Sequence, residues 1–134
     1  MACDIAWERA GVVKTFAGFV TGPQFIVSAE TVAADPRFDD LQFIINDFRA
    51  IDGHSIDSDA YLAVAASRLG SVRTNANFRV LFIADGPLAS ELATAVEPSV
   101  MSAPFDPMFF PTLEAGREWL AGQPRLSDFR PSEY

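Results

Sequence analysis

The sequence predicts an α/β fold with a mixed central sheet of about five strands, flanked by about four helices. Short apolar runs rich in β-branched and aromatic residues alternate with segments whose apolar residues recur at helical spacing. Residues typical of turns and helix caps separate the two kinds of segment. Strands that alternate with helices are typical of a sheet that is largely parallel.

Two strands open the chain and are expected to form a hairpin. Residues 4–9 alternate polar and apolar side chains, Ala10 and Gly11 can turn the chain, and residues 12–20 form the second strand. Gly18 interrupts the second strand, which indicates a bulge or a close approach of another backbone.

The first helix has a clear beginning and a clear end. Thr21 and Gln24 have the spacing of a capping box, and Pro23 is tolerated in the first turn. The helix is expected to end at Asp35, because Pro36 disfavours the α conformation in the residue before it.

The centre of the predicted sheet is the apolar run at residues 41–47 (LQFIIND), which fits a strand covered on both faces. A polar, acidic turn is expected to follow, and then a helix whose first turn contains Asp57, Ser58 and Asp59. The carboxyl end of such a strand is where α/β proteins place their sites. The apolar face of the helix is formed by Leu62, Ala65, Ala66, Leu69 and Val72.

Residues 79–84 (RVLFIA) form the next buried strand. The helix after it begins at Asp85 and is expected to stop at Pro98. A short strand at residues 108–110 lies between prolines, which places it at an edge of the sheet.

Thr112 caps the last helix, and Gly122 ends it. We predict one domain over residues 1–122 and a loosely ordered tail over residues 123–134.

The composition excludes several classes of protein. The 134 residues carry a net charge of −8, which argues against nucleic-acid binding and against a polybasic membrane anchor. No apolar run is long enough to span a membrane. Cys3 is the single cysteine, so no disulfide forms within the chain. We expect a cytoplasmic protein.

The order of elements resembles the SpoIIAA-like fold, which includes the anti-sigma-factor antagonists (STAS domains) and a looser group of uncharacterised bacterial proteins. The resemblance spans most of residues 8–121. It depends on Gly18 with Val20-Thr21-Gly22, on residues 35–41 (DPRFDDL), on Asn46-Asp47-Phe48, and on residues 110–115 (FPTLEA) with Trp119-Leu120.

The resemblance implies a site at the start of the helix after the central strand. Antagonists of this kind carry an Asp-Ser pair there, and a partner kinase phosphorylates the serine. Asp57 and Ser58 lie in the corresponding region, so Ser58 is either a phosphoacceptor or a helix cap. Asp59 and Ala60 replace the glycine that usually follows, and the preceding loop is longer, which favours the cap.

Few residues are candidates for catalysis or for binding a metal or ligand. His54 is the only histidine, and no nucleophile elbow accompanies it. Asp52, His54, Asp57 and Asp59 are weak candidates for a metal or ligand site, because a zinc site needs more His or Cys. Asp47 and Asp85 both follow predicted strands and would form a carboxylate pair only if they met. No nucleotide-binding motif is present, and we predict no catalytic residue, no metal and no cofactor.

Two surface groups complete the candidates. An anion pocket is one interpretation of Arg68, Arg73 and Arg79 with Asn75 and Asn77, and a solvated rim is the other. A protein interface is predicted at Phe105, Met108, Phe109 and Phe110, because prolines hinder the full burial of so many apolar side chains.

We therefore expect a non-catalytic domain that binds a protein partner or forms a homodimer, with a regulatory role like that of the antagonists. The alternative is a domain that binds a small apolar ligand or lipid, since lipid-binding relatives share the fold. A weak enzyme is the third hypothesis.

Overall fold

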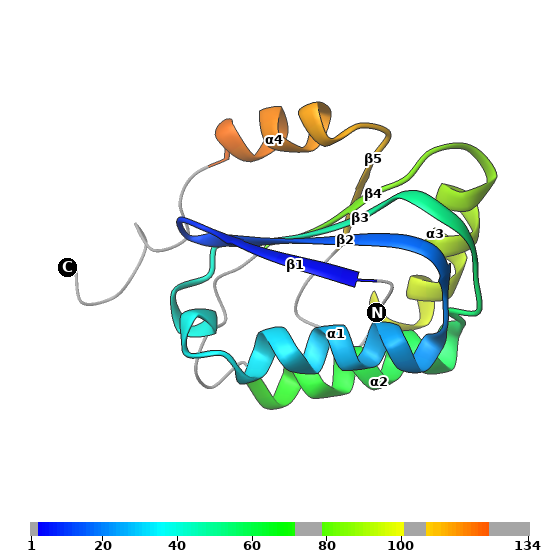
Figure 1. Cartoon of the computed structure of the whole chain (residues 1–134), viewed down its shortest axis with the longest axis horizontal. Coiled ribbons are helices and arrows are strands. Elements are labelled where there is room, and N and C mark those ends of the chain that lie inside the picture. The colour runs from blue at the N-terminus through cyan, green and yellow to red at the C-terminus, as the bar shows by residue number, and fades with distance from the viewer. Residues whose placement is uncertain (1–2, 72–78, 101–106, 124–134) are drawn as a thin grey trace.

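The structure, a computed structural model, describes residues 3–71, 79–100 and 107–123 (Figure 1). Five strands form one sheet in the order β1-β2-β3-β4-β5, in which β1 is antiparallel to β2 and all other neighbours are parallel. The predicted α/β fold with a mixed five-stranded sheet is confirmed. The strands are β1 (Cys3–Glu8), β2 (Gly11–Val20), β3 (Phe43–His54), β4 (Arg79–Ile83) and β5 (Met108–Phe110).

Four α-helices cover the two faces of the sheet unequally (Figure 1). Apolar residues of α1, α2 and α3 pack on one face, and those of α4 pack on the other. The helices are α1 (Gly22–Ala34), α2 (Ser58–Ser71), α3 (Gly86–Val100) and α4 (Leu113–Ala121), and a 3-10 turn, η1 (Pro36–Asp40), precedes β3. No helix among the described residues is long and apolar enough to cross a membrane.

The N-terminal hairpin and the first helix form as the sequence predicts. β2 shifts register against β3 between Gly18 and Phe19, where Gly18 has a φ of 69°, so the predicted bulge is confirmed. The amide of Gln24 donates to Thr21 Oγ1, and Gln24 Oε1 accepts from the amide of Thr21, which completes the capping box.

β3 is longer than the sequence indicates, and the prediction of a turn after Asp47 is wrong. The strand continues to His54 because its second half pairs with the end of β2. β4 pairs only with Phe43–Asp47 of β3, so among the described residues no strand pairs with the other side of the second half. A strand in that position does not need an uninterrupted apolar sequence.

Two predictions about the next helices also need correction. α2 buries Ala60, Tyr61 and Val64, whereas Leu62 is only half-buried. α3 continues past Pro98 to Val100. Proline removes one amide donor, and that loss does not prevent two further helical residues at the end of a helix.

The C-terminal elements agree with the prediction. β5 lies at the sheet edge, and Thr112 Oγ1 accepts from the amide of Ala115 to cap α4. α4 approaches the sheet closely at Gly116, where a Cβ atom would lie 3.1 Å from Ile83 Cδ1. The predicted tail lies outside the described residues from residue 124 onward, so its boundary stays a prediction.

The core beneath α1 contains one charged side chain, which the sequence analysis did not single out. Lys14 is 1% exposed, and its Nζ lies 3.1 Å from Ser28 Oγ, 5.0 Å from the ring centre of Phe25 and 5.7 Å from that of Phe16. Ser28 donates its own hydroxyl proton to the carbonyl of Phe25. The two rings and the hydroxyl provide favourable contacts for a buried ammonium group.

Candidate functional site

The candidate site lies where β3 ends and α2 begins, and two hydrogen bonds of Ser55 fix the connection. The amide of Ser55 donates to the carbonyl of Val20 at 2.9 Å, and Ser55 Oγ accepts from the amide of Gly22 at 3.2 Å. The first turn of α1 and the segment before α2 are therefore tied together. This is the carboxyl end of β3, where parallel sheets usually place their ligands.

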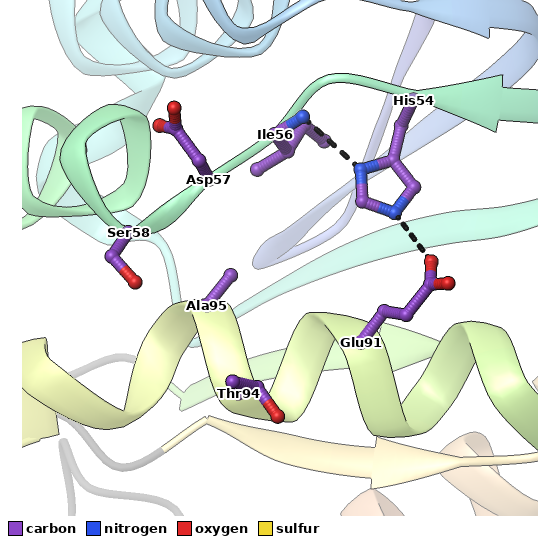
Figure 2. Close-up of a pocket in the computed structure, with 7 residues that line it drawn as sticks. All are labelled: His54, Ile56, Asp57, Ser58, Glu91, Thr94 and Ala95. Carbon is purple, nitrogen blue, oxygen red and sulfur yellow. Dashed lines mark hydrogen bonds and ion pairs between the residues drawn. The ribbon is translucent and has the colours of Figure 1, made fainter.

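His54, the last residue of β3, connects this segment to α3. Its Nδ1 accepts the amide proton of Ile56 at 3.1 Å, and its Nε2 lies 3.1 Å from Glu91 Oε2 (Figure 2). With Nδ1 as the acceptor, Nε2 is the ring nitrogen that donates to Glu91. The segment predicted as a polar turn thus connects β3 to α2, and the bonds of His54 to Ile56 and Glu91 hold it in place.

Two adjoining cavities share His54 and Glu91. The first, which we call the α2 groove, has a volume of about 390 Å³ and lies between the start of α2 and the middle of α3 (Figure 2). The second, the β3 cavity, has a volume of about 440 Å³ and lies between the end of β3 and the first turns of α3. The α2 groove is lined by His54, Ile56, Asp57, Ser58, Glu91, Thr94 and Ala95, and the β3 cavity by Phe19, Ile51, Asp52, Gly53, His54, Leu88 and Glu91.

Asp57 and Ser58 both line the α2 groove, but they have different structural roles. Asp57 Oδ1 accepts from the amide of Ala60 at 2.8 Å, and its carbonyl accepts from the amide of Tyr61. Asp57 is therefore the N-cap, and Ser58 is the first residue of α2. Ser58 is half-buried in the wall of the groove, and the prediction that Ser58 caps the helix is wrong, because Asp57 has that role.

Asp47 and Asp85 are in different settings. Asp47 lies within β3 rather than at its end, is buried, and forms a two-point ion pair with Arg49 at 3.0 and 2.9 Å. This pairing raises the pKa of Arg49 above its ordinary value, mainly through the hydrogen bond. Asp85 is exposed at the start of α3, where its carbonyl accepts from the amide of Ala89. Each residue has a structural role, which does not favour a catalytic pair.

The acidic candidates do not form a metal cluster within the described chain. Asp52 lines the β3 cavity and Asp57 lines the α2 groove, on either side of His54. Among the residues that the structure describes, no three His, Cys, Asp or Glu side chains lie close enough to hold a metal ion.

The predicted arginine cluster falls largely outside the described side chains. Arg79 stacks on Trp119, with its guanidinium carbon 5.7 Å from the ring centre. The side chain of Arg68 is not described, and Arg73, Asn75 and Asn77 lie outside the described residues.

The predicted interface at β5 is divided between the two faces of the sheet. Phe109 stacks on Phe82 at 5.2 Å, and Phe110 contacts Trp119 at 5.6 Å on the opposite face. Both rings are half-buried, whereas Met108 is 37% exposed. Phe105 lies outside the described residues. An interface at this edge therefore depends on Met108 more than on the two rings.

Eight lining residues were not among the site candidates from the sequence, namely Phe19, Ile51, Gly53, Ile56, Leu88, Glu91, Thr94 and Ala95. Phe19 is 56% exposed, the highest value among the large hydrophobic residues that the structure describes. Its position directly after Gly18, at the predicted bulge, was the one available signal. Glu91 resembles any other exposed helical glutamate until the fold places it beside His54.

Solved structures with a similar fold are known. The anti-sigma factor antagonist SpoIIAA in its unphosphorylated form superposes with a TM-score of 0.58 at 14% identity, covering 91% of this chain and 100% of that one. The Bacillus cell fate determinant SpoIIAA in its phosphorylated form gives a TM-score of 0.52 at 14% identity, covering 89% and 99% of the two chains.

An uncharacterised DUF3478-family protein with a SpoIIAA-like fold, from Shewanella loihica PV-4, is 22% identical over 89% of this chain and 92% of its own, with a TM-score of 0.49. No protein-family model matches the sequence, and no curated protein matches it.

Proposed function

We propose that this chain, which has the SpoIIAA-like fold, is a non-catalytic protein-binding domain with a regulatory role, and that its partner binds over the α2 groove. The observation that supports this most directly is the groove itself. It lies at the carboxyl end of β3 and is open to solvent, and Ser58 and Thr94 face it (Figure 2).

The fold neighbours support a regulatory role. One is named an anti-sigma factor antagonist, and SpoIIAA structures represent both a phosphorylated and an unphosphorylated form. In this chain Glu91 of α3 lines the groove together with Ser58. Asp57 belongs to the Asp-Ser pair of the antagonists and does not argue against a phosphate, but the carboxylate of Glu91 would repel one on that serine. We therefore propose regulation by partner binding alone, without phosphorylation of Ser58.

The groove can be tested with two matched threonine variants. Thr94, in the groove, and Thr31, on the exposed face of α1, each donate a hydroxyl proton to the carbonyl one turn earlier. Both side chains are exposed, so an arginine is accommodated at either position without disturbing the core.

The tagged chain and both variants are expressed in the native host, cross-linked in the cell and purified, and the bound proteins are quantified by mass spectrometry. We expect a partner that is captured by the wild type and by Thr31→Arg and is lost with Thr94→Arg. Equal capture of the partner by both variants would show that the partner does not bind over the α2 groove. Stoichiometric phosphate on Ser58 in the purified protein would contradict regulation without phosphorylation.

A further inference from the structure

The second half of β3, residues 49–54, is a strand with one open edge. We call it the β3 extension. β2 pairs with it as far as His54, whereas β4 pairs with β3 only up to Asp47. In the described part of the chain no strand pairs with the other edge of the extension. Such an edge presents backbone donors and acceptors that another strand can use.

The β3 cavity adjoins this open edge, and an exposed aromatic ring forms part of its wall. Ile51, Asp52, Gly53 and His54 of the extension form one side, and Leu88 and Glu91 of α3 form another. Phe19 completes the lining from β2, with more than half of its surface exposed. An exposed aromatic residue beside an unpaired strand edge is typical of an interaction surface.

The acidic residues that line the cavity have no basic residue among them, and Arg49, the cation at the start of the extension, is paired with Asp47. Asp52 and Glu91 line it and Asp57 lies in the adjoining groove, and neither lining includes a lysine or an arginine. Glu91 holds His54 through Oε2, and among the described residues Oε1 has no partner. With a net charge of −8 on the whole chain, the cavity favours a cationic ligand.

The chain itself shows how such a cation would be held. The guanidinium carbon of Arg37 lies 4.2 Å from the ring centre of Trp7, and two of the guanidinium nitrogens, Nε and Nη2, donate to Asp35 at 3.0 and 2.8 Å. An aromatic face with a carboxylate beside it is thus a working guanidinium site in this protein. Phe19 with Asp52 and Glu91 offers the same pair of groups, and no lysine or arginine is among the described residues that line this cavity.

We propose that the β3 extension binds an extended, basic segment of a partner protein, which pairs with the open strand edge and places an arginine in the β3 cavity between Phe19, Asp52 and Glu91. This inference rests on the proposed protein-binding function and adds the chemistry of the partner.

Three synthetic peptides test the proposal. The first alternates arginine with valine, the second replaces each arginine with neutral citrulline, and the third keeps arginine but carries N-methyl groups that block strand pairing. Binding is measured by fluorescence anisotropy at low and physiological salt, and NMR amide shifts locate the peptide. We expect the arginine peptide to shift residues 49–54 and the first turns of α3. Citrulline should weaken binding about tenfold, as the loss of one charge-assisted interaction does, and N-methylation should abolish it.

Two variants of the protein complete the test. Glu91→Gln keeps an acceptor for His54 and removes the charge, and Asp39→Asn makes the same kind of change on η1, at the other end of β3. We expect Glu91→Gln to weaken the arginine peptide and Asp39→Asn to leave it unchanged. Equal binding of the citrulline peptide, shifts elsewhere, or self-association of the free protein through residues 49–54 would each overturn the proposal. If none of the peptides binds while partner capture still depends on Thr94, the inference of a basic partner segment is wrong and the proposed protein-binding function is unaffected.

Discussion

At the scale of single residues, Ile45 is the side chain whose truncation tests the sheet most directly. It is fully buried in the centre of β3, in the cluster with Val13, Leu81 and Ile83 beneath α4. We expect Ile45→Ala to lower the free energy of unfolding by about 2–5 kcal/mol, measured by urea unfolding. Thr15→Ala, an exposed change on β2, serves as the control and should stay within about 0.5 kcal/mol. A loss below about 1 kcal/mol for Ile45→Ala would show that this site is less tightly packed.

At the start of α2, the helix cap and the candidate phosphoacceptor are two different residues. Asp57 caps the helix through the amide of Ala60, and Ser58 is the first residue of the helix. We expect Asp57→Ala to cost about 1 kcal/mol of unfolding free energy and Ser58→Ala to cost under about 0.5 kcal/mol, by thermal and urea unfolding. The opposite order of the two losses would return the capping role to Ser58.

The sequence located part of this site and could not locate the rest. Asp52, His54, Asp57 and Ser58 are visible because they follow an apolar strand, and such positions are where α/β folds place their sites. Phe19 and Glu91 enter from other elements, and only the packing of β2 and α3 against β3 brings them to His54. No local sequence pattern distinguishes an exposed glutamate that bonds to a histidine from one that is only solvated.

At the scale of elements, the sequence predicted every strand and helix, with errors where tertiary pairing overrode local pattern. The residues DGH after Ile51 have the composition of a turn, yet β2 extends far enough to pair with them and hold them as a strand. α2 turns Tyr61 and Val64 inward, and Tyr61 fills the space beside Phe25 and Phe82. A helical period gives the spacing of the buried face, but the shape of the core selects which residues occupy it.

The contact between the first strand and the last helix gives a prediction about pH. Arg117 on α4 donates two hydrogen bonds to Glu8 on β1, at 3.0 and 2.6 Å. This bonding, and secondarily the charge of Arg117, lowers the pKa of Glu8 below its ordinary value of 4.5 although partial burial opposes the shift. A lowered pKa in the folded state means that the stabilisation is full above about pH 4.5 and is lost as the pH falls through the lowered value.

Urea unfolding of wild type and Glu8→Gln from about pH 7 downward should therefore show a difference that shrinks in acid. Because both side chains are partly exposed, we expect a difference of up to about 1 kcal/mol near neutral pH. Glu118→Gln is a control, since this exposed residue of α4 carries the same charge and is not part of the contact. A difference that does not vary with pH would mean that the ion pair does not form in solution.

At the scale of the whole molecule, the two faces of the sheet are unequally protected. Three helices close one face around a continuous aromatic cluster, whereas α4 alone covers part of the other. The parallel strands have helices in all three of their connections, and these helices lie on the same face (Figure 1). Among the described strands, edges without a neighbouring strand lie on β1, on β5 and where β3 extends beyond β4.

The outer edge of β5 is where a second copy of this chain is proposed to bind. Its short strand lies between Pro107 and Pro111, so backbone pairing there is limited and contact must come from side chains. Met108 is the exposed apolar group, whereas Phe109 is stacked on Phe82 in the core.

If a homodimer forms at this edge, Met108→Lys should convert it to a monomer with little change in the free energy of unfolding. Phe109→Ser should instead lower that free energy by about 2–4 kcal/mol, because it removes a half-buried ring that stacks on Phe82. Sedimentation velocity over a range of concentrations, with urea unfolding of each variant, separates the two effects. A wild-type chain that stays monomeric at every concentration would exclude the dimer, and a large loss of stability from Met108→Lys would show that this side chain supports the fold instead.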